Sequence, residues 1–367
     1  MKELKIMVPS SEQCSYTIKI GTDILPQVWE QIEGRFGKKG KFIITDENLA
    51  AAGHLDKLTG EREIPTFIIN PAGETSKHIN TVISIIDEME KCALGRDTIV
   101  IALGGGTVGD IGGFAAAIFK RGVPVIQIPT TTVAQADSSI GGKTGVDSAL
   151  SKNAFGAFWH PAAVFIDPAT LKTLDDRQYR AGLVESVKHA LIANSDYFEF
   201  IESNIDAILS RDTDVLETMA VHNCKIKGAV VEADPLEKNR RRMLNYGHTI
   251  GHAVEQASGY ELLHGEAIAI GITGAGLIEM ELGLGTKDRL ERIETLLKKI
   301  GVPVSIPGNL TENKLVNLIK HDKKAVQKRP RFVLIDEIGH IHQKNGQYAL
   351  NVEREIVENV IKKLKNR

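Results

Sequence analysis

The sequence predicts two domains, an α/β domain with a parallel sheet over residues 1–175 and a mostly α-helical domain over residues 176–367. The chain has 367 residues, more than a single domain usually contains. Its first half alternates short β-branched runs with helix-like stretches, which is typical of a parallel sheet covered by helices. After about Asp175 the pattern becomes that of successive helices.

The expected strands of the first domain are short apolar runs. They span Leu4–Val8, Tyr16–Ile20, Lys41–Thr45, Thr66–Ile69, Thr98–Leu103, Val123–Ile128 and Ala163–Ile166, with helices expected at Ser76–Lys91 and Gly109–Phe119. The run Thr98–Leu103 is apolar along nearly its whole length, which favours a strand with both faces covered.

The second domain shows the 3.6-residue period of helices almost throughout. Helices are expected at Arg180–Asn194, Tyr197–Leu209, Val215–Glu232, Thr249–Ala257, Glu266–Leu282, Asp288–Lys299, Thr311–Lys320 and Glu353–Leu364, and one strand at Arg331–Ile335.

Composition and charge exclude several classes of protein. Hydrophobic residues make up 42% and charged residues 25%, with a net charge of -2, so we expect a large core and no dedicated nucleic-acid binding. Cys14, Cys92 and Cys224 form no CxxC motif, which argues against a disulfide framework and a thiolate zinc site. The sequence contains no apolar run of about 20 residues and no signal-peptide pattern, so we expect a cytoplasmic protein without a membrane partner.

A glycine-rich turn follows the expected strand Thr98–Leu103. It reads Leu103-Gly-Gly-Gly-Thr-Val-Gly-Asp110 and leads into a helix, so its free N–H groups suit a phosphate. Gly104, Gly106 and Gly109 satisfy G-x-G-x-x-G, but no acidic residue follows about 20 positions later, so the dinucleotide signature is incomplete. A tight turn without a ligand is the alternative interpretation.

Polar residues follow the next expected strand, Val123–Ile128. The segments Pro129-Thr-Thr-Thr132 and Asp137-Ser-Ser-Ile-Gly-Gly-Lys143 come after it, with Lys152 and Asn153 further along. Because ligands of open α/β sheets bind at the carboxyl ends of strands, these residues indicate a polyoxygenated, anionic ligand. A cap or turn role is the alternative for Asp137 alone.

Histidines and acidic residues at helical spacing indicate a metal site in the second domain. His248 and His252 are four residues apart and share one helix face, as do Glu185 and His189. His264 and Glu266 follow at the start of another expected helix. Three ligands with an open position would suit a catalytic zinc ion, but the spacing alone leaves all six residues as candidates.

Cations precede the histidine-rich helix. Lys225, Lys227 and the run Arg240–Arg242 form either a solvated face or a site for a carboxylate or phosphate. The basic run Lys320–Arg331 is interpreted as a solvated loop. Together these features predict a metal-assisted, dinucleotide-dependent enzyme that acts on an anionic substrate in an interdomain cleft.

A set of motifs, in the same order and at the same spacing, resembles the 3-dehydroquinate synthase family. The motifs are Gly104-Gly-Gly-x-x-Gly-Asp110, Phe114-Ala-Ala, Arg121-Gly122, Pro129-Thr-Thr, Ala134-Gln-x-Asp-Ser-Ser139, Gly141-Gly-Lys-Thr-Gly145, Lys152-Asn153, Gly156-x-Phe158, Leu244-Asn-x-Gly-His-Thr249 and His264-Gly-Glu266. The resemblance extends from about Asp46 to Lys324. It implies the dehydroquinate synthase-like fold, with a Rossmann-like N-terminal domain and an α-helical C-terminal domain, and a cytoplasmic homodimer.

The resemblance also implies the reaction. Members of this family are lyases of the shikimate pathway, which leads to chorismate and the aromatic amino acids. They convert 3-deoxy-D-arabino-heptulosonate 7-phosphate to 3-dehydroquinate and phosphate, using NAD and a divalent metal, commonly zinc, with cobalt as an alternative. The implied sequence is transient oxidation by NAD, phosphate elimination, re-reduction, ring opening and intramolecular aldol closure.

Site residues follow from the resemblance position by position. The implied metal ligands are Glu185, His248 and His264, which leaves His252 on the substrate side. The implied NAD contacts are Asp46, Gly73, Glu74, Lys77, Gly105, Gly106, Thr107, Val108, Gly109, Asp110, Thr130, Thr131, Lys143, Lys152, Thr170, Leu171, Lys172, Thr173 and Gln178. The implied substrate-side residues are Asp137, Lys143, Lys152, Asn153, Lys188, Lys227, Arg241, Asn245, His252 and one of Lys323 and Lys324.

Individual roles are hypotheses at this stage. Lys152, Asn153, Arg241 and one of Lys323 and Lys324 are the candidates for the phosphate, which revises in part the solvated-loop interpretation. Lys227 is the candidate for the carboxylate. Asp147 stands where the family often has Asn, close to Lys152 in the sequence.

Three alternatives stay open. Another sugar-phosphate cyclase, such as 2-deoxy-scyllo-inosose or 2-epi-5-epi-valiolone synthase, would share the fold, NAD and metal. A relative of glycerol dehydrogenase would release NADH and would not need the phosphate-directed cations. A silent binding protein would not need the complete set of metal ligands.

Overall fold

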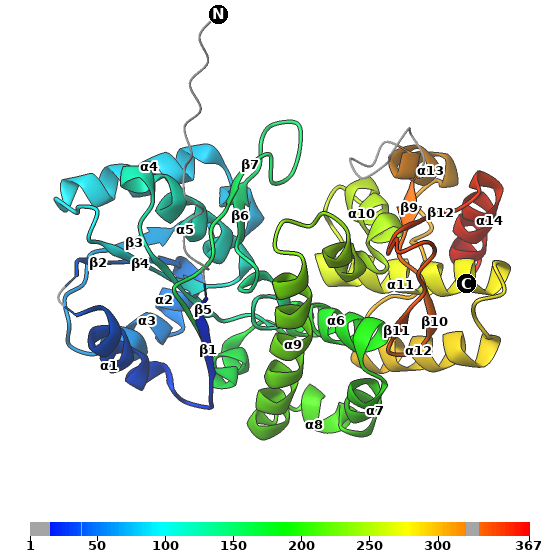
Figure 1. Cartoon of the computed structure of the whole chain (residues 1–367), viewed down its shortest axis with the longest axis horizontal. Coiled ribbons are helices and arrows are strands. Elements are labelled where there is room, and N and C mark those ends of the chain that lie inside the picture. Colours follow the sequence, from blue (N-terminus) through cyan, green and yellow to red (C-terminus); the bar gives the residue numbers. More distant parts are fainter. Residues whose placement is uncertain (1–14, 38, 321–329) are drawn as a thin grey trace, which may run out of the picture.

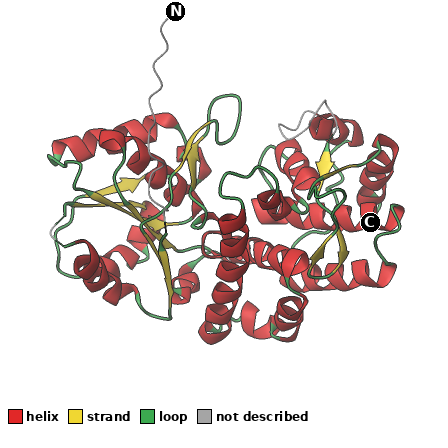
Figure 2. Cartoon of the chain, viewed as in Figure 1, coloured by secondary structure: helices red, strands yellow, loops and turns green. Residues whose placement is uncertain are grey.

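The computed structural model describes residues 15–37, 39–320 and 330–367 (Figure 1). A sheet with helices on both faces occupies the N-terminal half, and helices make up most of the C-terminal half (Figure 2). This arrangement confirms the predicted fold class. The expected strand Leu4–Val8 lies outside the described residues, and the division into domains at 175/176 stays a prediction.

The central sheet of the described N-terminal half has six strands, and every neighbouring pair is parallel. Its order is β1 (Thr17–Ile20), β8 (Ala163–Ile166), β5 (Val125–Pro129), β4 (Ile99–Gly104), β2 (Lys41–Asp46) and β3 (Thr66–Ile69). After β2 the chain first adds β3 on one side and then β4 on the other. This reversal of direction makes the carboxyl ends of β2 and β4 a topological switch point, where ligands of open α/β sheets bind.

Alternate side chains of the strands enter two separate cores. On one face, Phe42 and Ile44 of β2 pack with α4 (Ile79–Lys91) and α5 (Gly106–Ile118). On the other face, Ile43 packs with α1 (Leu25–Phe36) and α3 (His54–Thr59). Because successive side chains of a strand point to opposite faces, helices on both sides account for the nearly continuous apolar runs.

Several small elements of this half escape prediction. They are α1, α2 (Glu47–Ala51), α3, the 3₁₀ turns Glu74–Ser76 and Pro168–Thr173, the π-helical turn Ala134–Ser138, and the antiparallel strands β6 (Lys143–Val146) and β7 (Phe155–Phe158). β7 reads Phe-Gly-Ala-Phe and lacks β-branched residues, so it gives little strand signal. The hairpin β6–β7 matters for the site because its connecting loop carries Lys152 and Asn153.

The helices of the C-terminal half agree closely with the predicted segments. They are α6 (Asp176–Ala193), α7 (Ser195–Ser203), α8 (Ile205–Leu209), α9 (Thr213–Ala233), α10 (His248–Ala257), α11 (His264–Glu281), α12 (Lys287–Ile300), α13 (Glu312–Lys320) and α14 (Arg354–Lys365). None of the helices in the described residues is both long and apolar enough to cross a membrane.

Two predicted elements of this half are wrong in detail. The single helix expected at Tyr197–Leu209 is broken at Asn204, which ends α7 and hydrogen-bonds the carbonyl of Phe200 through its side-chain Nδ2 (2.8 Å). Such local bonding competes with helix continuation. The single strand expected at Arg331–Ile335 is two short strands, β9 (Arg331–Phe332) and β10 (Ile335–Glu337), which pair with β12 (Leu350–Asn351) and β11 (His340–Ile341) respectively.

Helix α11 is buried along most of its length and packs unusually close to α10. A Cβ added to Gly271 would lie 1.9 Å from the carbonyl oxygen of Gly247, which directly precedes α10. Near its other end, α11 contributes the fully buried Glu279, which forms an ion pair with Arg289 of α12 (2.7 Å). Only small residues allow two helix backbones to approach this closely, so the glycines determine how far apart the first residues of α10 and α11 lie.

Candidate functional site

Polar groups lie at the carboxyl ends of β2 and β5, the two strands that flank β4 in the sheet. Asp46 ends β2, is buried, and caps α2 by accepting a hydrogen bond from the Leu49 N–H (3.0 Å). Burial raises the pKa of this carboxyl. Thr130 directly follows β5, and its buried Oγ1 has no hydrogen-bond partner among the described residues. An unpaired buried hydroxyl at this edge is available to a ligand.

The glycine-rich turn allows close approach of the backbone at the start of α5. A Cβ on Gly105 would lie 2.9 Å from Cγ2 of Thr131, and one on Gly106 would lie 3.0 Å from Oγ of Ser138. Gly105 occupies the N-cap position and offers no side chain to the first N–H groups of α5. These groups and the helix dipole therefore suit an anion such as a pyrophosphate.

Two residues of the turn also have packing roles. A Cβ on Gly109 would lie 2.7 Å from Oε1 of Gln127, so this glycine allows α5 to pack against β5. Val108 is buried in the core, and a Cβ on Gly104 would lie 2.6 Å from its side chain. The side chain of Val108 therefore packs against the backbone of the turn.

An ion-pair network lies beside the turn. Lys77 Nζ is 2.7 Å from Asp110 Oδ2, and Thr107 donates a hydrogen bond to Glu74 (3.2 Å). Burial raises the pKa of Asp110 in spite of Lys77. Glu74 follows Gly73, whose φ of 96° requires a glycine. The network fixes the first turn of α5 and places charged groups next to its N-terminus.

Glu185, His248 and His264 come together from three helices. Glu185 lies in the middle of α6, whereas His248 and His264 are the first residues of α10 and α11. Glu185 Oε1 is buried without a hydrogen-bond partner in the described chain, 3.9 Å from His248 Nε2 and 3.5 Å from His264 Nε2. His248 Nδ1 lies 3.0 Å from the carbonyl oxygen of Tyr246 and donates to it, so its Nε2 is the available ligand atom.

The charges around this cluster favour a cation. Burial, reinforced by Lys188, lowers the pKa of His248 well below its usual value, so its imidazole is neutral. Burial also opposes a charge on His264, but Glu185 and Glu255 raise the pKa of His264 to about 9. A carboxylate and two imidazoles with one open position are a typical donor set of a catalytic zinc site.

The geometry by itself also admits His252. Ligand atoms of His248, His252 and His264 lie within 4.8 Å of one another, and so do those of Asp137, Glu185 and His189. His189 Nε2 is 3.4 Å from Asp137 Oδ1. The structure therefore brings together five of the six candidate ligands that the spacing suggested. Glu266, the sixth, is not in either group and forms an ion pair with Arg177 (2.7 Å).

Buried lysines surround Asp137. Lys227 Nζ lies 2.8 Å from Asp137 Oδ1 and also donates to the Asp137 carbonyl oxygen. Lys188, which is fully buried, forms an ion pair with Glu185. Burial raises the pKa of Asp137, but Lys227 and Lys188 outweigh it and hold the pKa well below its usual range. Asp137 therefore stays ionised, with Lys227 at its side.

Arg241 and Asn245 approach the same region from the segment before α10. Arg241 is buried, its Nε has no hydrogen-bond partner in the described chain, and its Nη1 donates to the carbonyl of Pro235 (2.8 Å). A Cβ on Gly141 would lie 2.3 Å from Arg241 Nη2, so this glycine makes room for the guanidinium. Asn245 Nδ2 donates to Glu237 (3.2 Å), which also forms an ion pair with Lys143.

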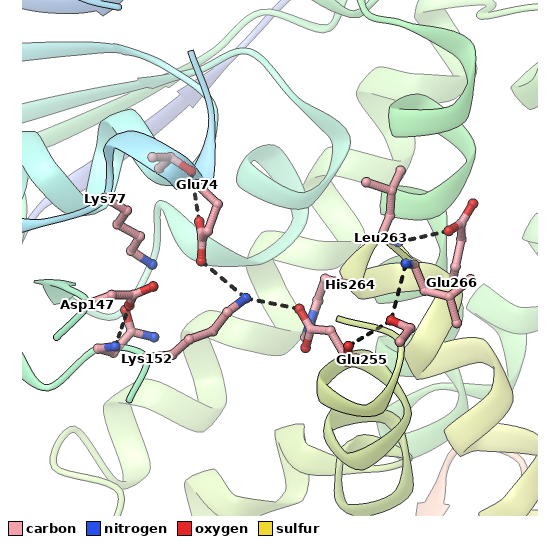
Figure 3. Close-up of polar contacts among 12 residues, drawn as sticks. Glu74, Lys77, Asp147, Lys152, Glu255, Leu263, His264 and Glu266 are labelled. Atoms are coloured by element: carbon pink, nitrogen blue, oxygen red, sulfur yellow. Dashed lines mark hydrogen bonds and ion pairs between the residues drawn. The ribbon is translucent and has the colours of Figure 1, made fainter. Parts of the chain in front are cut away.

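The β6–β7 loop crosses toward the helical half. Lys152 Nζ lies 3.3 Å from Glu74 Oε1 and 3.1 Å from Glu255 Oε1, so one lysine contacts both halves (Figure 3). Asp147 accepts a hydrogen bond from the N–H of Asn153 (2.6 Å). Asp147 therefore shapes the loop that presents Lys152 and Asn153.

The other predicted NAD contacts include the 3₁₀ turn Pro168–Thr173 and Gln178. Thr170 accepts from Gln135 Nε2 (3.1 Å), Thr173 Oγ1 lies 2.7 Å from His54 Nε2, and the side chain of Leu171 packs in a hydrophobic core. Lys172 and Gln178 are exposed. Lys323 and Lys324 are outside the described residues.

Sequence reasoning missed Glu255 and Glu237. Glu255 contacts His264 Nδ1 (3.5 Å) as well as Lys152. It lies seven residues after His248 and three after His252, so helical periodicity could have found it on the same face of α10. No local signal marks Glu237, because it pairs with Lys143 from the other half of the chain.

Comparisons with known proteins agree on one family. The family model described as "3-dehydroquinate synthase N-terminal" matches residues 67–181, and that described as "3-dehydroquinate synthase C-terminal" matches residues 182–325. The 3-dehydroquinate synthase of Ruminiclostridium cellulolyticum is 43% identical over 334 residues, which cover 90% of this chain and 92% of the relative. That of Nitrosospira multiformis is 41% identical over 338 residues, with coverages of 91% and 92%.

Solved structures share the whole fold. A 2-deoxy-scyllo-inosose synthase complexed with carbaglucose-6-phosphate, NAD+ and Co2+ has a TM-score of 0.84 and 29% identity, and covers 94% of this chain and 96% of its own. The 2-epi-5-epi-valiolone synthase of Streptomyces hygroscopicus, with NAD+ and Zn2+ bound, has a TM-score of 0.87 and 26% identity, with coverages of 98% and 99%. Identity to the cyclase structures is lower than to the synthases. The two family regions and the curated synthases together cover nearly all of the fold, and this chain belongs to the 3-dehydroquinate synthase family of carbocycle-forming lyases.

Proposed function

We propose that this chain converts 3-deoxy-D-arabino-heptulosonate 7-phosphate to 3-dehydroquinate and phosphate with NAD and a divalent metal held by its own residues. One observation carries the assignment of the site. Glu185 Oε1 is buried without a hydrogen-bond partner among the described residues and faces two imidazoles, directly beside an ionised Asp137 and buried lysines. Family membership and the metal-bound cyclases of the same fold support this assignment.

Glu185, His248 and His264 would hold the metal, which we infer to be zinc, with cobalt as an alternative. Their donor atoms fit such an ion, because Glu185 Oε1 has no hydrogen-bond partner in the part of the chain that the structure describes and His248 is neutral. His252 lies near enough to be a fourth ligand, and we assign it to the substrate because the three-ligand set leaves the open position that catalysis requires.

The carboxyl edge of the sheet would hold NAD. Three features fit a dinucleotide: the uncapped start of α5, the glycines that allow close approach, and Oγ1 of Thr130, which is unpaired in the described chain. We assign to this site Asp46, Gly73, Glu74, Lys77, Gly105 to Asp110, Thr130, Thr131 and Lys152, with Lys143 and the segment Thr170–Thr173 and Gln178 at its margin. When bound, the metal and NAD supply polarisation of substrate oxygens and a reversible hydride acceptor.

The cations would orient the two anionic ends of the substrate. The planar guanidinium of Arg241, whose Nε has no partner within residues 15–37, 39–320 and 330–367, suits the phosphate, together with Lys152 and Asn153 on the β6–β7 loop. Lys227, buried beside Asp137, suits the carboxylate. Holding both ends fixes the reacting carbons relative to the metal ligands, and this is the largest contribution that such side chains make.

The ionised Asp137 would act as a hydrogen-bond acceptor for a substrate hydroxyl. Its low pKa, held down by Lys227 and Lys188 against the effect of burial, excludes a role as a proton donor near neutral pH. The other polar side chains that we assign to the substrate in this region are Lys188, Asn245 and His252. Their donor groups can stabilise negative charge that develops on the substrate oxygens.

The assay uses purified protein treated with a chelator, then reloaded with Zn2+ and supplied with catalytic NAD and the heptulosonate 7-phosphate. We expect stoichiometric phosphate, 3-dehydroquinate by NMR, and no accumulation of NADH. Without metal, phosphate release should stop. Turnover of heptulose 7-phosphate or glucose 6-phosphate instead would assign the chain to another cyclase, and steady NADH formation from a polyol would assign it to the dehydrogenases.

Two further inferences concern the state of the protein. We infer a homodimer and a cytoplasmic location, which the family resemblance supports. Light scattering after size-exclusion chromatography tests the first, and a mass near 40.1 kDa, the mass of one chain, would refute it. Fractionation of the producing cell tests the second.

A further inference from the structure

Glu255 uses its two carboxylate oxygens for two different parts of the molecule. Oε1 lies 3.1 Å from Nζ of Lys152, on the β6–β7 loop, and Oε2 lies 3.5 Å from Nδ1 of His264, at the start of α11. The side chain is only 9% exposed. A carboxylate buried to this extent needs partners for its charge, and these two contacts provide them.

The contact with His264 determines which ring nitrogen is available. Glu255 accepts from Nδ1–H, so this nitrogen is engaged and Nε2 is the ring nitrogen that faces Glu185 Oε1 (3.5 Å). His248 has the same arrangement, with the Tyr246 carbonyl as its acceptor. A carboxylate in this position makes the imidazole a better electron donor than a backbone carbonyl does.

The contact with Lys152 extends this arrangement into the other half of the chain. Lys152 also reaches Glu74, which lies beside the N-terminus of α5 (Figure 3). Acidic and basic groups therefore alternate from Glu74 through Lys152 and Glu255 to His264. Because each group contacts the next, a displacement of Lys152 alters the surroundings of the carboxylate that orients His264.

We propose that Glu255 is a positioning residue that orients His264 as a metal ligand and that couples the metal ligands, through Lys152, to the nucleotide side of the site. The proposal rests on the metal site proposed above. The proposed function gives Glu255 no other role, and Glu255 is in neither group of candidate metal ligands found among the described residues.

The first experiment measures Zn2+ affinity by competition with a chromogenic chelator in the E255Q and E255L variants. Gln keeps an acceptor for Nδ1–H but loses the charge, whereas Leu keeps the volume and loses both. We expect affinity to fall in the order wild type, E255Q, E255L, with a loss of about 10-fold to 100-fold for Leu. The E279Q variant is the matched control, because it removes another buried carboxylate paired with a cation, near the far end of α11. It should leave Zn2+ affinity unchanged.

The second experiment tests the coupling with K152M in the wild-type and E255L backgrounds. The direct effect of the lysine charge on the metal is common to both backgrounds, so any difference reports the path through Glu255. We expect K152M to change Zn2+ affinity by a larger factor in the wild-type background, where Glu255 is present, than in the E255L background. Equal factors would overturn the coupling.

The outcomes separate this proposal from the proposed function. If wild-type protein binds no divalent metal, the metal site itself is wrong. If wild type binds Zn2+ and E255L binds it equally well, only the role of Glu255 is wrong. If E255L does not fold, as judged by circular dichroism, the E255Q variant alone tests the role of Glu255. An unchanged Zn2+ affinity in E255Q, with no change in the visible spectrum of its Co2+ form, would then overturn the proposal.

Discussion

The G271A substitution should separate α10 from α11 and disturb the candidate metal site without touching it. A Cβ at this position would lie 1.9 Å from the carbonyl oxygen of Gly247 and 2.8 Å from the N of Gly251. Real Cβ contacts are essentially never shorter than 3.0 Å, so the carbonyl contact must lengthen by at least 1.1 Å. Both obstacles are backbone atoms, which cannot rotate out of the way as a side chain can.

The magnitude follows from this geometry. Overpacking a core costs about 1–3 kcal/mol, and the backbone obstacles place G271A at the upper end, near 3 kcal/mol. Gly247 directly precedes His248, and Gly271 lies two helical turns after His264. A shift of about 1 Å between catalytic groups costs on the order of 100-fold in rate. We therefore expect a stability loss together with a large loss of activity and weaker Zn2+ binding.

Urea denaturation and the phosphate-release assay measure the two effects. The control is G34A, because Gly34 lies in α1 and an added Cβ there would have nothing within 4 Å. This variant should be more stable than the wild type by about 0.5–1 kcal/mol, since alanine has a higher helix propensity than glycine. A G271A protein with wild-type stability and Zn2+ affinity would refute the argument from close helix packing.

Three further predictions concern groups away from the metal ligands. Burial raises the pKa of Glu279 to about 7 in spite of its arginine partner, so the folded state binds this proton more tightly than the unfolded state does. The free energy of unfolding should fall by up to about 3 kcal/mol as pH rises from about 4.5 to 7. Urea titrations of E279Q at several pH values should not show this fall. Burial raises the pKa of the Cys224 thiol to about 12, so little reactive thiolate is present at pH 8. After treatment with an alkylating reagent, mass spectrometry should find Cys224 unalkylated until the protein unfolds. Rapid labelling of the native protein would contradict this. K77M leaves the partly buried Asp110 without its cation. It should lower stability by about 3 kcal/mol and weaken NAD binding, as followed by calorimetry; unaltered NAD affinity would remove this pair from the nucleotide site.

Most of the architecture could be predicted from local patterns. The strands Thr66–Ile69 and Ala163–Ile166 have the predicted bounds, because short apolar β-branched runs end at clear turn residues. The π-helical turn at Ala134–Ser138 and the strand Phe155–Phe158 escaped prediction, because their side chains carry no periodic signal. Their conformations depend on contacts with the rest of the fold.

The candidate site divides in the same way. The sequence by itself determined the chemical types present, namely a glycine-rich turn before a helix, histidines at helical spacing, and isolated cations. Only the tertiary structure decided which of them meet, because Glu185, His248 and His264 come from three helices and Lys152 reaches Glu255 across the two halves of the chain. Helical spacing is a property of neighbouring residues, whereas the distance between the ends of α10 and α11 depends on how closely Gly271 lets two backbones approach.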